Sequence, residues 1–324
     1  MHGNVEEWCY DWYGPYQPEI QVDPVGRSDG DFKVTRGGSH STEIYYLRSA
    51  NRMGTLPEDK HWLIGFRVVT GELPKTQPLP VLEAKGWQHS VRQDRPPDIN
   101  QGPDPDMPYF KGPRKYVKIP EGSTGPLYSK HNHDPAIASP NGDILAIWYT
   151  CFREPGRELA LAASRLRYGA EEWDEADLFW DAPDRNDHAP ALMCDYTGTL
   201  YHFNGISAGP GYKKGGLALI MRTSVDNGVT WSKAWFVNPE RGVPSQPVAC
   251  EFITEKGDIV FVSDAPGSRS VLWISRDNGQ SWTLSNGSIA GIHAGVVQLT
   301  DGRLMAFGRG NDIQGKMPKS VSDN

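Results

Sequence analysis

The chain has 324 residues and a formal net charge of −7, and it is rich in Gly (35), Pro (26) and Trp (11). Its length allows two domains of ordinary size, each with a core of its own. The negative charge and the lack of a basic stripe exclude a typical nucleic-acid-binding protein, although a few converging arginines can still attract an anionic substrate. No apolar run reaches the ~18 residues of a membrane span.

Four cysteines are spread along the chain, at Cys9, Cys151, Cys194 and Cys250, with no C-x-x-C pair among them. Closely spaced cysteines are the usual mark of a metal or redox site. This spacing therefore predicts buried free thiols.

The first 126 residues divide into two parts. Residues 1–70 hold short aromatic and glycine-rich segments without an obvious helix. Residues 71–126 contain 11 of the 26 prolines, and proline cannot donate the ladder hydrogen bonds of a strand interior. We therefore predict a separate N-terminal unit over 1–70 and an extended, semi-rigid linker over 71–126.

From residue 127 onward one turn sequence recurs, each time after an apolar strand. Residues 224–231 read SVDNGVTW and residues 275–282 read SRDNGQSW. The Asp carboxylate can accept backbone N–H bonds, and Asn and Gly tolerate the positive φ of a tight hairpin turn. A weaker copy lies at 164–173, and residues 320–324 match the beginning of a fourth. The framework of the two full copies is Ser224, Asp226, Gly228 and Trp231, and Ser275, Asp277, Gly279 and Trp282.

Each of these turns closes a unit of predicted strands. A unit opens with a strand (134–138, 189–193, 247–253 and 294–299) and continues through a glycine-containing turn to a second apolar strand (144–149, 200–203, 259–262 and 304–307). A loop and a third strand lead to the repeated turn. Four-stranded units that recur about every 50–60 residues are typical of β-propeller blades. A β-sandwich, the main alternative, would not repeat one turn in phase.

The S-x-D-N-G-x-[ST]-W turns resemble the Asp-box (BNR) repeats of sialidases and related propellers. The resemblance covers residues 127–324, some three and a half blades, whereas sialidase-like propellers have about six blades or more. The predicted fold is therefore mainly β, with a partial propeller truncated at its C-terminal end. In this family the Asp-box is a structural turn remote from the substrate, so we expect no catalytic role for it.

Four ordered motifs mark the N-terminal unit: GNVEEWCYDW at 3–12, VTRGGS at 34–39, RSANR at 48–52 and GFRVV at 65–69. They resemble the C-terminal part of formylglycine-generating enzymes (sulfatase-modifying factors), a mixed α/β domain. That activity needs a cysteine pair after the Gly-Gly-Ser segment, and residues 39–47 contain none, so we expect no sulfatase activation. The resemblance also implies a Ca²⁺ site formed by the carbonyls of Gly3 and Val5 and the carboxylate of Glu7. The alternative is that Glu7 caps a turn.

The candidate site lies at the starts of the innermost strands. In a propeller these starts share one face with the loops between the second and third strands, and the Asp-box turns lie toward the opposite side. Histidine and aspartate gather at the strand starts, and arginine gathers in or near the loops. The catalytic candidates are Asp134, Asp187, His133 and His188, and the substrate-binding candidates are His131, Arg153, Arg157, Arg185, His293 and Arg309.

These residue types suit a carbohydrate that carries an acidic group. Arginine binds a carboxylate with two parallel hydrogen bonds. A retaining glycosidase needs an acid/base and a nucleophile on opposite sides of the bond, and Asp134 and Asp187 are the carboxylates with the best predicted positions. We therefore expect a sialidase-like exo-glycoside hydrolase that acts on an acidic or deoxy sugar and requires no cofactor.

Two alternatives remain open. The first is a polysaccharide lyase in which His133 or His188 abstracts the proton beside a uronate carboxylate. The second is a non-catalytic glycan-binding propeller, whose axial polar residues hydrogen-bond neighbouring blades around water. The chain has no clear Arg-Ile-Pro segment and no clear Tyr–Glu nucleophile pair of the sialidase type. Family analogy favours an exported protein, periplasmic or extracellular.

Overall fold

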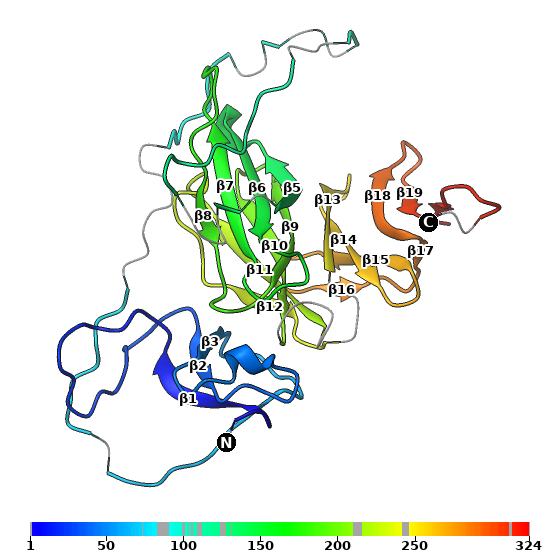
Figure 1. Ribbon diagram of the computed structural model, residues 1–324. Helices are drawn as coiled ribbons and strands as arrows, with labels where there is room; N and C mark the ends of the chain where they lie inside the picture. Colours follow the sequence, from blue (N-terminus) through cyan, green and yellow to red (C-terminus); the bar gives the residue numbers. More distant parts are fainter. Residues whose placement is uncertain are drawn as a thin grey trace.

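The computed structural model of the chain is built almost entirely from strands and loops (Figure 1). It describes residues 2–72, 74–82, 91–98, 101–102, 104, 106–108, 112–123, 128–129, 131–209, 216–241, 246–310 and 313–323. The predicted boundary at 126–127 and the last residue of the partial fourth turn, Asn324, lie outside these ranges. Within the ranges, no helix has the length and apolar character needed to cross a membrane.

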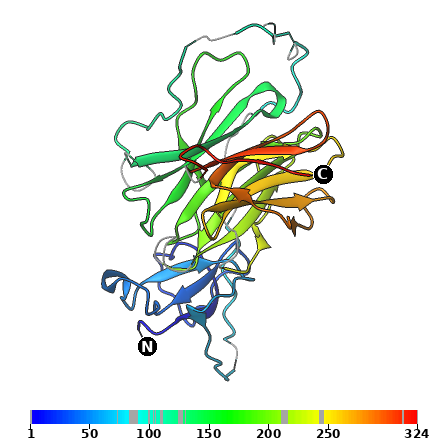
Figure 2. The same ribbon diagram turned by 90° about the vertical axis from the view of Figure 1, so that its right-hand side faces the viewer.

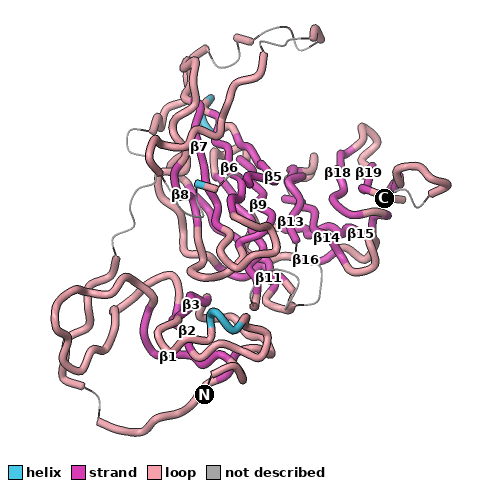
Figure 3. Tube along the Cα trace, in the orientation of Figure 1, coloured by secondary structure: helices cyan, strands magenta, loops and turns pink. Residues whose placement is uncertain are grey.

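The N-terminal unit is a small four-stranded sheet (Figure 1, blue). Its strands are β1 (Glu6–Trp12), β2 (Lys33–Arg36), β3 (Arg52–Thr55) and β4 (Ile64–Gly65), in the order β3-β2-β1-β4. The one helical turn among its described residues is the short 3₁₀ segment η1 (Ile44–Tyr46), drawn in cyan in Figure 3. Phe32 and Leu56 of this unit lie in the same apolar cluster as residues of the propeller. The sheet therefore packs directly against the propeller.

Residues 131–321 form four successive antiparallel sheets, which are the predicted blades (Figures 1 and 2). The first blade contains β5 (His131–Ala138), β6 (Ile144–Cys151), β7 (Ala160–Leu166) and β8 (Asp177–Trp180), with the 3₁₀ turn η3 (Pro140–Gly142) between its first two strands. The second contains β9 (Asp187–Cys194), β10 (Leu200–Ser207), β11 (Leu217–Ser224) and β12 (Trp235–Asn238).

The third blade contains β13 (Gln246–Ile253), β14 (Ile259–Ala265), β15 (Arg269–Ser275) and β16 (Thr283–Leu284), and β17 (Ile289–Ala290) also pairs with β15. The fourth contains β18 (Ile292–Gln298), β19 (Leu304–Arg309) and β20 (Lys319–Val321). The inner strands β5, β9, β13 and β18 begin one to three residues earlier than predicted. They contact one another in sequence order and so line a common axis.

Apolar side chains fill the layers between successive blades, because alternate residues of a buried strand face opposite sides of its sheet. Leu161 of the first blade and Ile220 of the second belong to one cluster. Phe203 of the second blade stacks on Phe261 of the third, with ring centroids 4.5 Å apart. A third cluster joins the third and fourth blades. This succession of layers is the packing expected of a propeller.

The first Asp-box turn is closed by its own side chains. Asp226 accepts the backbone N–H of Thr230 at 2.9 Å and its hydroxyl at 2.6 Å. The Ser224 hydroxyl accepts the Gly228 N–H at 2.9 Å. Asn227 has a φ of 58°, which asparagine tolerates better than most residues. The pairing of β9, β10 and β11 puts this turn at the end of the blade opposite the start of the inner strand.

The second Asp-box turn repeats these hydrogen bonds. Its residues are Ser275, Asp277, Asn278, Gly279 and Ser281, with the same donors and acceptors at 2.5–2.8 Å. Trp231 and Trp282 pack beneath the two turns, against Phe179 and Phe261, and the ring centroids are 5.1 Å apart in both pairs.

Part of the proline-rich segment lies against the first blade. Tyr116 packs edge-on against Trp148, with ring centroids 5.2 Å apart. The backbone N–H of Ala176 donates to the Lys118 carbonyl at 2.7 Å, and the Lys118 ammonium pairs with Glu172 at 2.5 Å. Residues 116–118 therefore cover Trp148 in addition to connecting the two units. The division of the chain at 70 and 126 stays a prediction.

Candidate active site

A β-bulge interrupts the start of the inner strands. The register of β5 with β6 shifts between His133 and Ala136, and equivalent shifts occur in β9, β13 and β18. Residues 133–136 read His-Asp-Pro-Ala and residues 188–191 read His-Ala-Pro-Ala, so the sequence encodes one bulge twice. Asp134, Ala189 and His293 have φ values of 55°, 56° and 50°. A left-handed non-glycine residue costs about 1–2 kcal/mol, and such strain gathers at functional sites.

The bulges bring several side chains together at one end of the axis. We call this group the axial rim, and it consists of His131, His133, Asp134, His188 and His293. The rings of His131 and His133 have centroids 5.9 Å apart. His131 and His133 are exposed, whereas His188 is buried beneath them. Five of the sequence-predicted site residues are therefore neighbours.

Asp134 is the carboxyl group of the axial rim. Burial raises its pKa to about 6, although the nearby charges of His133 and His293 oppose the increase. The carboxylates of Asp264 and Glu154 raise the pKa further. A carboxyl group with this pKa keeps its proton in weakly acidic solution and can release it, which are the properties of a general acid.

A second carboxylate reaches the rim from the third blade. Asp264, on β14, accepts the backbone N–H of His293 at 2.6 Å and lies 2.9 Å from Nδ1 of the same residue. The hydrogen bond to Asp264 raises the pKa of His293. Asp134 and Asp264 therefore belong to different blades, and the second of them is fixed in orientation.

Tyr149 lies beneath the rim, with a side chain that is 0 % exposed. Its hydroxyl is 2.5 Å from Nδ1 of His133 and also forms a hydrogen bond with Glu154. Burial raises the pKa of Tyr149, and the charges of Glu154 and Asp134 raise it further, so the side chain stays a neutral phenol. The Tyr149 ring stacks on His188, with centroids 5.1 Å apart. Burial lowers the pKa of His188 to about 4, so it is a neutral imidazole at pH 7.

Asp187 is not part of the axial rim. Its side chain is 0 % exposed, and one carboxylate oxygen accepts the N–H of Ala182 at 2.7 Å. Burial and the charge of Asp181 hold the pKa of Asp187 well above its usual range. The repeated His-x-Pro-Ala sequence aligns Asp134 with Ala189, so Asp187 corresponds to Asn132. Asp187 therefore lies two residues before the position equivalent to Asp134, and its predicted role opposite Asp134 stays a prediction that its complete burial does not support.

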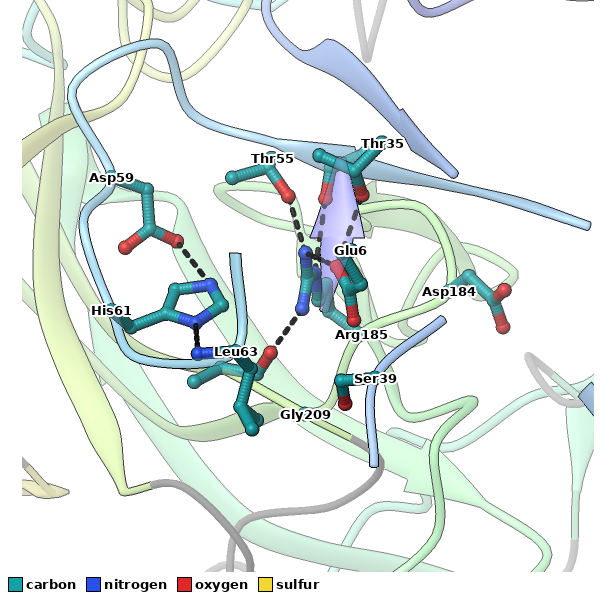
Figure 4. Close-up of polar contacts among 12 residues, drawn as sticks. Glu6, Thr35, Ser39, Thr55, Asp59, His61, Leu63, Asp184, Arg185 and Gly209 are labelled. Carbon is teal, nitrogen blue, oxygen red and sulfur yellow. Dashed lines mark hydrogen bonds and ion pairs between the residues drawn. The ribbon is translucent and has the colours of Figure 1, made fainter. Parts of the chain in front are cut away.

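Arg185 lies in a buried junction between the N-terminal sheet and the propeller (Figure 4). Its side chain is 1 % exposed, and it donates to the Glu6 carboxylate at 3.1 Å, to the Gly54 carbonyl at 3.1 Å and to the Thr55 hydroxyl. Thr35 donates to the same Glu6 oxygen at 3.1 Å. All of these contacts lie inside the protein. The prediction that Arg185 binds substrate is therefore corrected, since its guanidinium holds the two units together.

Arg157 belongs to the same junction. It pairs with Asp184, and its guanidinium lies 4.1 Å from the ring centroid of Tyr46 in the N-terminal unit. Arg157 is buried by these contacts, and its predicted role in substrate binding is corrected in the same way. Arg153 is 71 % exposed and lies 3.8 Å from Glu43 at the edge of the junction.

Arg309 is the predicted arginine that lies near the rim. It ends β19 as an exposed residue opposite Ile292, and its charge lowers the pKa of His293. Three residues outside the predicted set also surround the rim: Tyr149, Glu154 and Asp264. The propeller geometry assigns the segments that carry Glu154 and Asp264 to this face, whereas Tyr149 had no such signal.

The predicted Ca²⁺ residues lie on and before β1. The Glu7 carboxylate pairs with the Arg67 guanidinium at 2.6 Å and 2.9 Å, so a cation would have to displace this ion pair. In the part of the chain that the structure describes, no group of three or more His, Cys, Asp and Glu side chains is arranged to hold a metal ion. A Ca²⁺ site at Gly3, Val5 and Glu7 stays a prediction without support from the donor set.

Comparison with protein families assigns both parts of the chain. Residues 142–324, more than half of the sequence, match the BNR repeat-like domain, and residues 1–71 match the sulfatase-modifying factor enzyme 1-like domain. The formylglycine-generating enzyme of Streptomyces coelicolor is 40% identical over 70 residues, which are 20% of this chain and 22% of that protein. The chain thus spans about a fifth of the length of this relative.

Solved structures with a similar fold include sialidases. A mutant of a Streptococcus pneumoniae sialidase aligns with a TM-score of 0.51 and 11% identity, over 65% of this chain and 52% of that one. A Trypanosoma rangeli sialidase in complex with sialic acid aligns with a TM-score of 0.51 and 14% identity, over 65% of this chain and 40% of that one. These likenesses concern the fold, and they confirm the predicted sialidase-like propeller.

Proposed function

The chain belongs to the BNR repeat-like domain family, and we propose that its axial rim cleaves glycosidic bonds as a sialidase-like exo-glycoside hydrolase. The substrate is a glycan that ends in an acidic or deoxy sugar. Sialidases are the named neighbours in fold, and one of them holds sialic acid. This likeness supports a glycan substrate but does not decide which sugar it is.

The observation that carries the proposal is the pair of carboxyl groups from different blades. Asp134 has a pKa of about 6 and can donate its proton to the leaving oxygen. Asp264 is held by two contacts from His293, and a carboxylate fixed in this way can stabilise the positive charge that develops on the sugar ring. These groups replace the predicted pair of Asp134 and Asp187.

The remaining residues of the rim suit recognition of the sugar. His131 and His133 are exposed and can form hydrogen bonds with hydroxyl groups. Arg309 is exposed beside His293 and can bind a carboxylate. Because Arg157 and Arg185 are buried in the junction, we assign recognition of an acidic group to Arg309.

A polysaccharide lyase is the second candidate. Exposed His133, backed by the Tyr149 hydroxyl, favours it, since a positioned histidine can abstract the proton beside a uronate carboxylate. Arg309 would neutralise that carboxylate. A glycan-binding propeller without catalysis is the third reading, and it would use the same rim.

The test is to incubate the purified chain with sialosides, rhamnosyl-uronates and uronic-acid polysaccharides, following new reducing ends and near-ultraviolet absorbance. We expect new reducing ends without absorbance, because hydrolysis leaves no double bond. Absorbance that rises with cleavage would replace the hydrolase with the lyase. Saturable binding of a glycan without either signal would contradict both enzymes.

A further inference from the structure

We propose that Glu154, Tyr149 and His133 form a hydrogen-bond relay that holds His133 in the tautomer with its proton on Nδ1. Its Nε2 is then a fixed hydrogen-bond acceptor for a hydroxyl group of the sugar. The assignment deepens the proposed function, because it names a group that selects the substrate at the axial rim. The two supporting residues are positioning residues, since neither needs to touch the sugar.

The direction of the relay follows from counting protons. The Tyr149 hydroxyl has one proton to donate and two neighbours, the Glu154 carboxylate and Nδ1 of His133. An ionised carboxylate has no proton and can only accept. The Tyr149 proton therefore goes to Glu154, and the Tyr149 oxygen accepts a proton from Nδ1 of His133.

The state of Tyr149 agrees with this direction. Burial and the neighbouring carboxylates raise its pKa, so the phenol keeps its proton and stays a donor. The His188 ring stacks on the Tyr149 ring, and its Nε2 is 3.9 Å from a Glu154 oxygen, longer than an ordinary hydrogen bond. A carboxylate can accept several hydrogen bonds, so this contact does not compete with the bond from the Tyr149 hydroxyl.

Burial distinguishes the residue that positions the imidazole from the residue that would contact the sugar. Tyr149 is fully buried, whereas His133 is exposed, and its Nδ1 is the ring nitrogen that meets the Tyr149 hydroxyl. The backbone of Glu154 is held as well, because the Asn186 amide donates to its carbonyl at 2.9 Å. In the same loop, Arg157 lies against Tyr46 of the N-terminal unit. Because the Tyr149 hydroxyl is buried, water does not compete for its hydrogen bonds. It can therefore hold the exposed imidazole of His133 in one orientation.

The chemistry of the acceptor fits a carbohydrate. A sugar hydroxyl can donate or accept a hydrogen bond; an imidazole held with Nε2 unprotonated accepts the hydroxyl proton, whereas the other tautomer would donate to the hydroxyl oxygen. A site built around one tautomer discriminates strongly against a ligand that lacks the matching hydroxyl, because the acceptor is then left unpaired. The relay therefore makes His133 a specificity-determining residue.

The decisive measurement is nitrogen-15 NMR of the full chain labelled at histidine, which reports the tautomer of each neutral ring. We expect His133, assigned by its loss in His133→Gln, to carry its proton on Nδ1. In Tyr149→Phe the proton should move to Nε2 or exchange between both nitrogens. Tyr201→Phe is the matched control, because Tyr201 is also buried with its hydroxyl 3.2 Å from a carboxylate, that of Asp195. It should leave the His133 signal unchanged.

A glycan measurement gives the second readout. With a glycan that the chain binds or cleaves, Tyr149→Phe should raise the Kd or KM about threefold to tenfold, the range of one lost hydrogen bond. A wild-type His133 with its proton on Nε2 would overturn the relay, whatever the activity of the protein. An Nδ1 proton in a protein that cleaves no glycan would instead retain the relay and contradict the proposed function.

Discussion

Asp277 and Asp134 show how differently the two ends of the blades treat the same side chain. At the Asp-box end, hydrogen bonds from the Ser281 hydroxyl and backbone lower the pKa of Asp277 to about 2. At the axial rim, burial raises the pKa of Asp134 to about 6. Both residues lie in turns or bulges that contain positive φ values. The backbone conformations are similar. The hydrogen-bond donors around each carboxyl group therefore decide whether the aspartate stays ionised and closes a turn or keeps a proton that it can donate.

The two ends of the blades also differ in how many of their carboxyl oxygens have hydrogen-bond partners. The Asp226 carboxylate accepts from Ser224 and Thr230, so the Asp-box turn is closed on itself. At the end of the blades that carries the axial rim, the Asp187 carboxyl at the start of β9 has one buried oxygen without a hydrogen-bond partner among the described residues. Burial holds the pKa of Asp187 well above its usual range. One end of the blade thus stabilises the fold, and the other end carries desolvated polar groups that cost stability.

The largest expected effect is on turnover. Asp134→Asn removes the proposed acid but keeps the size of the side chain and the tolerance of asparagine for positive φ. We expect the rate of glycan cleavage to fall about 10²–10⁴-fold, as for the loss of a general acid, with an unchanged circular dichroism spectrum. Near-normal turnover would show that Asp134 is a structural residue like Asp277.

The next effect is on stability as a function of pH. The pKa of Asp134 is raised in the folded state, from 3.8 to about 6, so the folded state binds more protons than the unfolded state within this window. Wild-type stability should therefore fall as the pH rises from about 4 to about 6, by on the order of 2 kcal/mol, and change little above it from this group. Denaturant unfolding of wild type and Asp134→Asn at several pH values checks this. Equal slopes in both proteins would contradict the raised pKa.

At the opposite end, Asp226→Ala should lower stability and leave activity intact. The change removes the acceptor of two Thr230 donors, and by analogy with loss of a helix cap the free energy of unfolding should fall by about 1–2 kcal/mol. Asp301→Ala, in an exposed turn that does not belong to an Asp-box, is the matched control and should have a smaller effect. A loss of turnover without a loss of stability would reverse the roles assigned to the two ends.

The smallest expected effect concerns backbone strain. Ala189 has a φ of 56° at the rim, where alanine is disfavoured, whereas Asn278 has the same φ in an Asp-box turn. Ala189→Gly should therefore raise the free energy of unfolding by about 0.5–1 kcal/mol, and Asn278→Gly should change it by less. Thermal unfolding of both variants measures the difference. Equal effects would mean that the bulge carries no more strain than the turn.

Much of the fold could be predicted because its signals are local. The apolar strands and the Asp-Asn-Gly turns lie close together in sequence, and each turn fixes its own hairpin. The rim histidines followed from the same pattern, since each precedes or forms a bulge at the start of an inner strand. The predicted strand starts at 134 and 189 and the His-x-Pro-Ala repeat both align Asp134 with Ala189, so the sequence already places Asp187 two residues before the equivalent of Asp134.

The rest of the site depends on contacts that sequence patterns do not report. Arg157 and Arg185 have the same local features as exposed loop arginines, but Tyr46 and Glu6 cover them from the other unit. Tyr149 ends an apolar strand and reads as a core residue, because nothing in its neighbourhood specifies that its hydroxyl meets His133. Side-chain partners far apart in the chain are set by packing, and packing is where pattern-based prediction ends.

The junction between the two units has a consequence for the history of the gene. Glu6 and Arg185 are 179 residues apart in the sequence and form a buried ion pair with each other. Replacing either alone leaves a desolvated charge, which typically costs about 3–5 kcal/mol. Substitutions at the two positions should therefore occur together among homologues. Recombination that exchanges the N-terminal unit should succeed only when the incoming sequence brings a partner that matches the arginine.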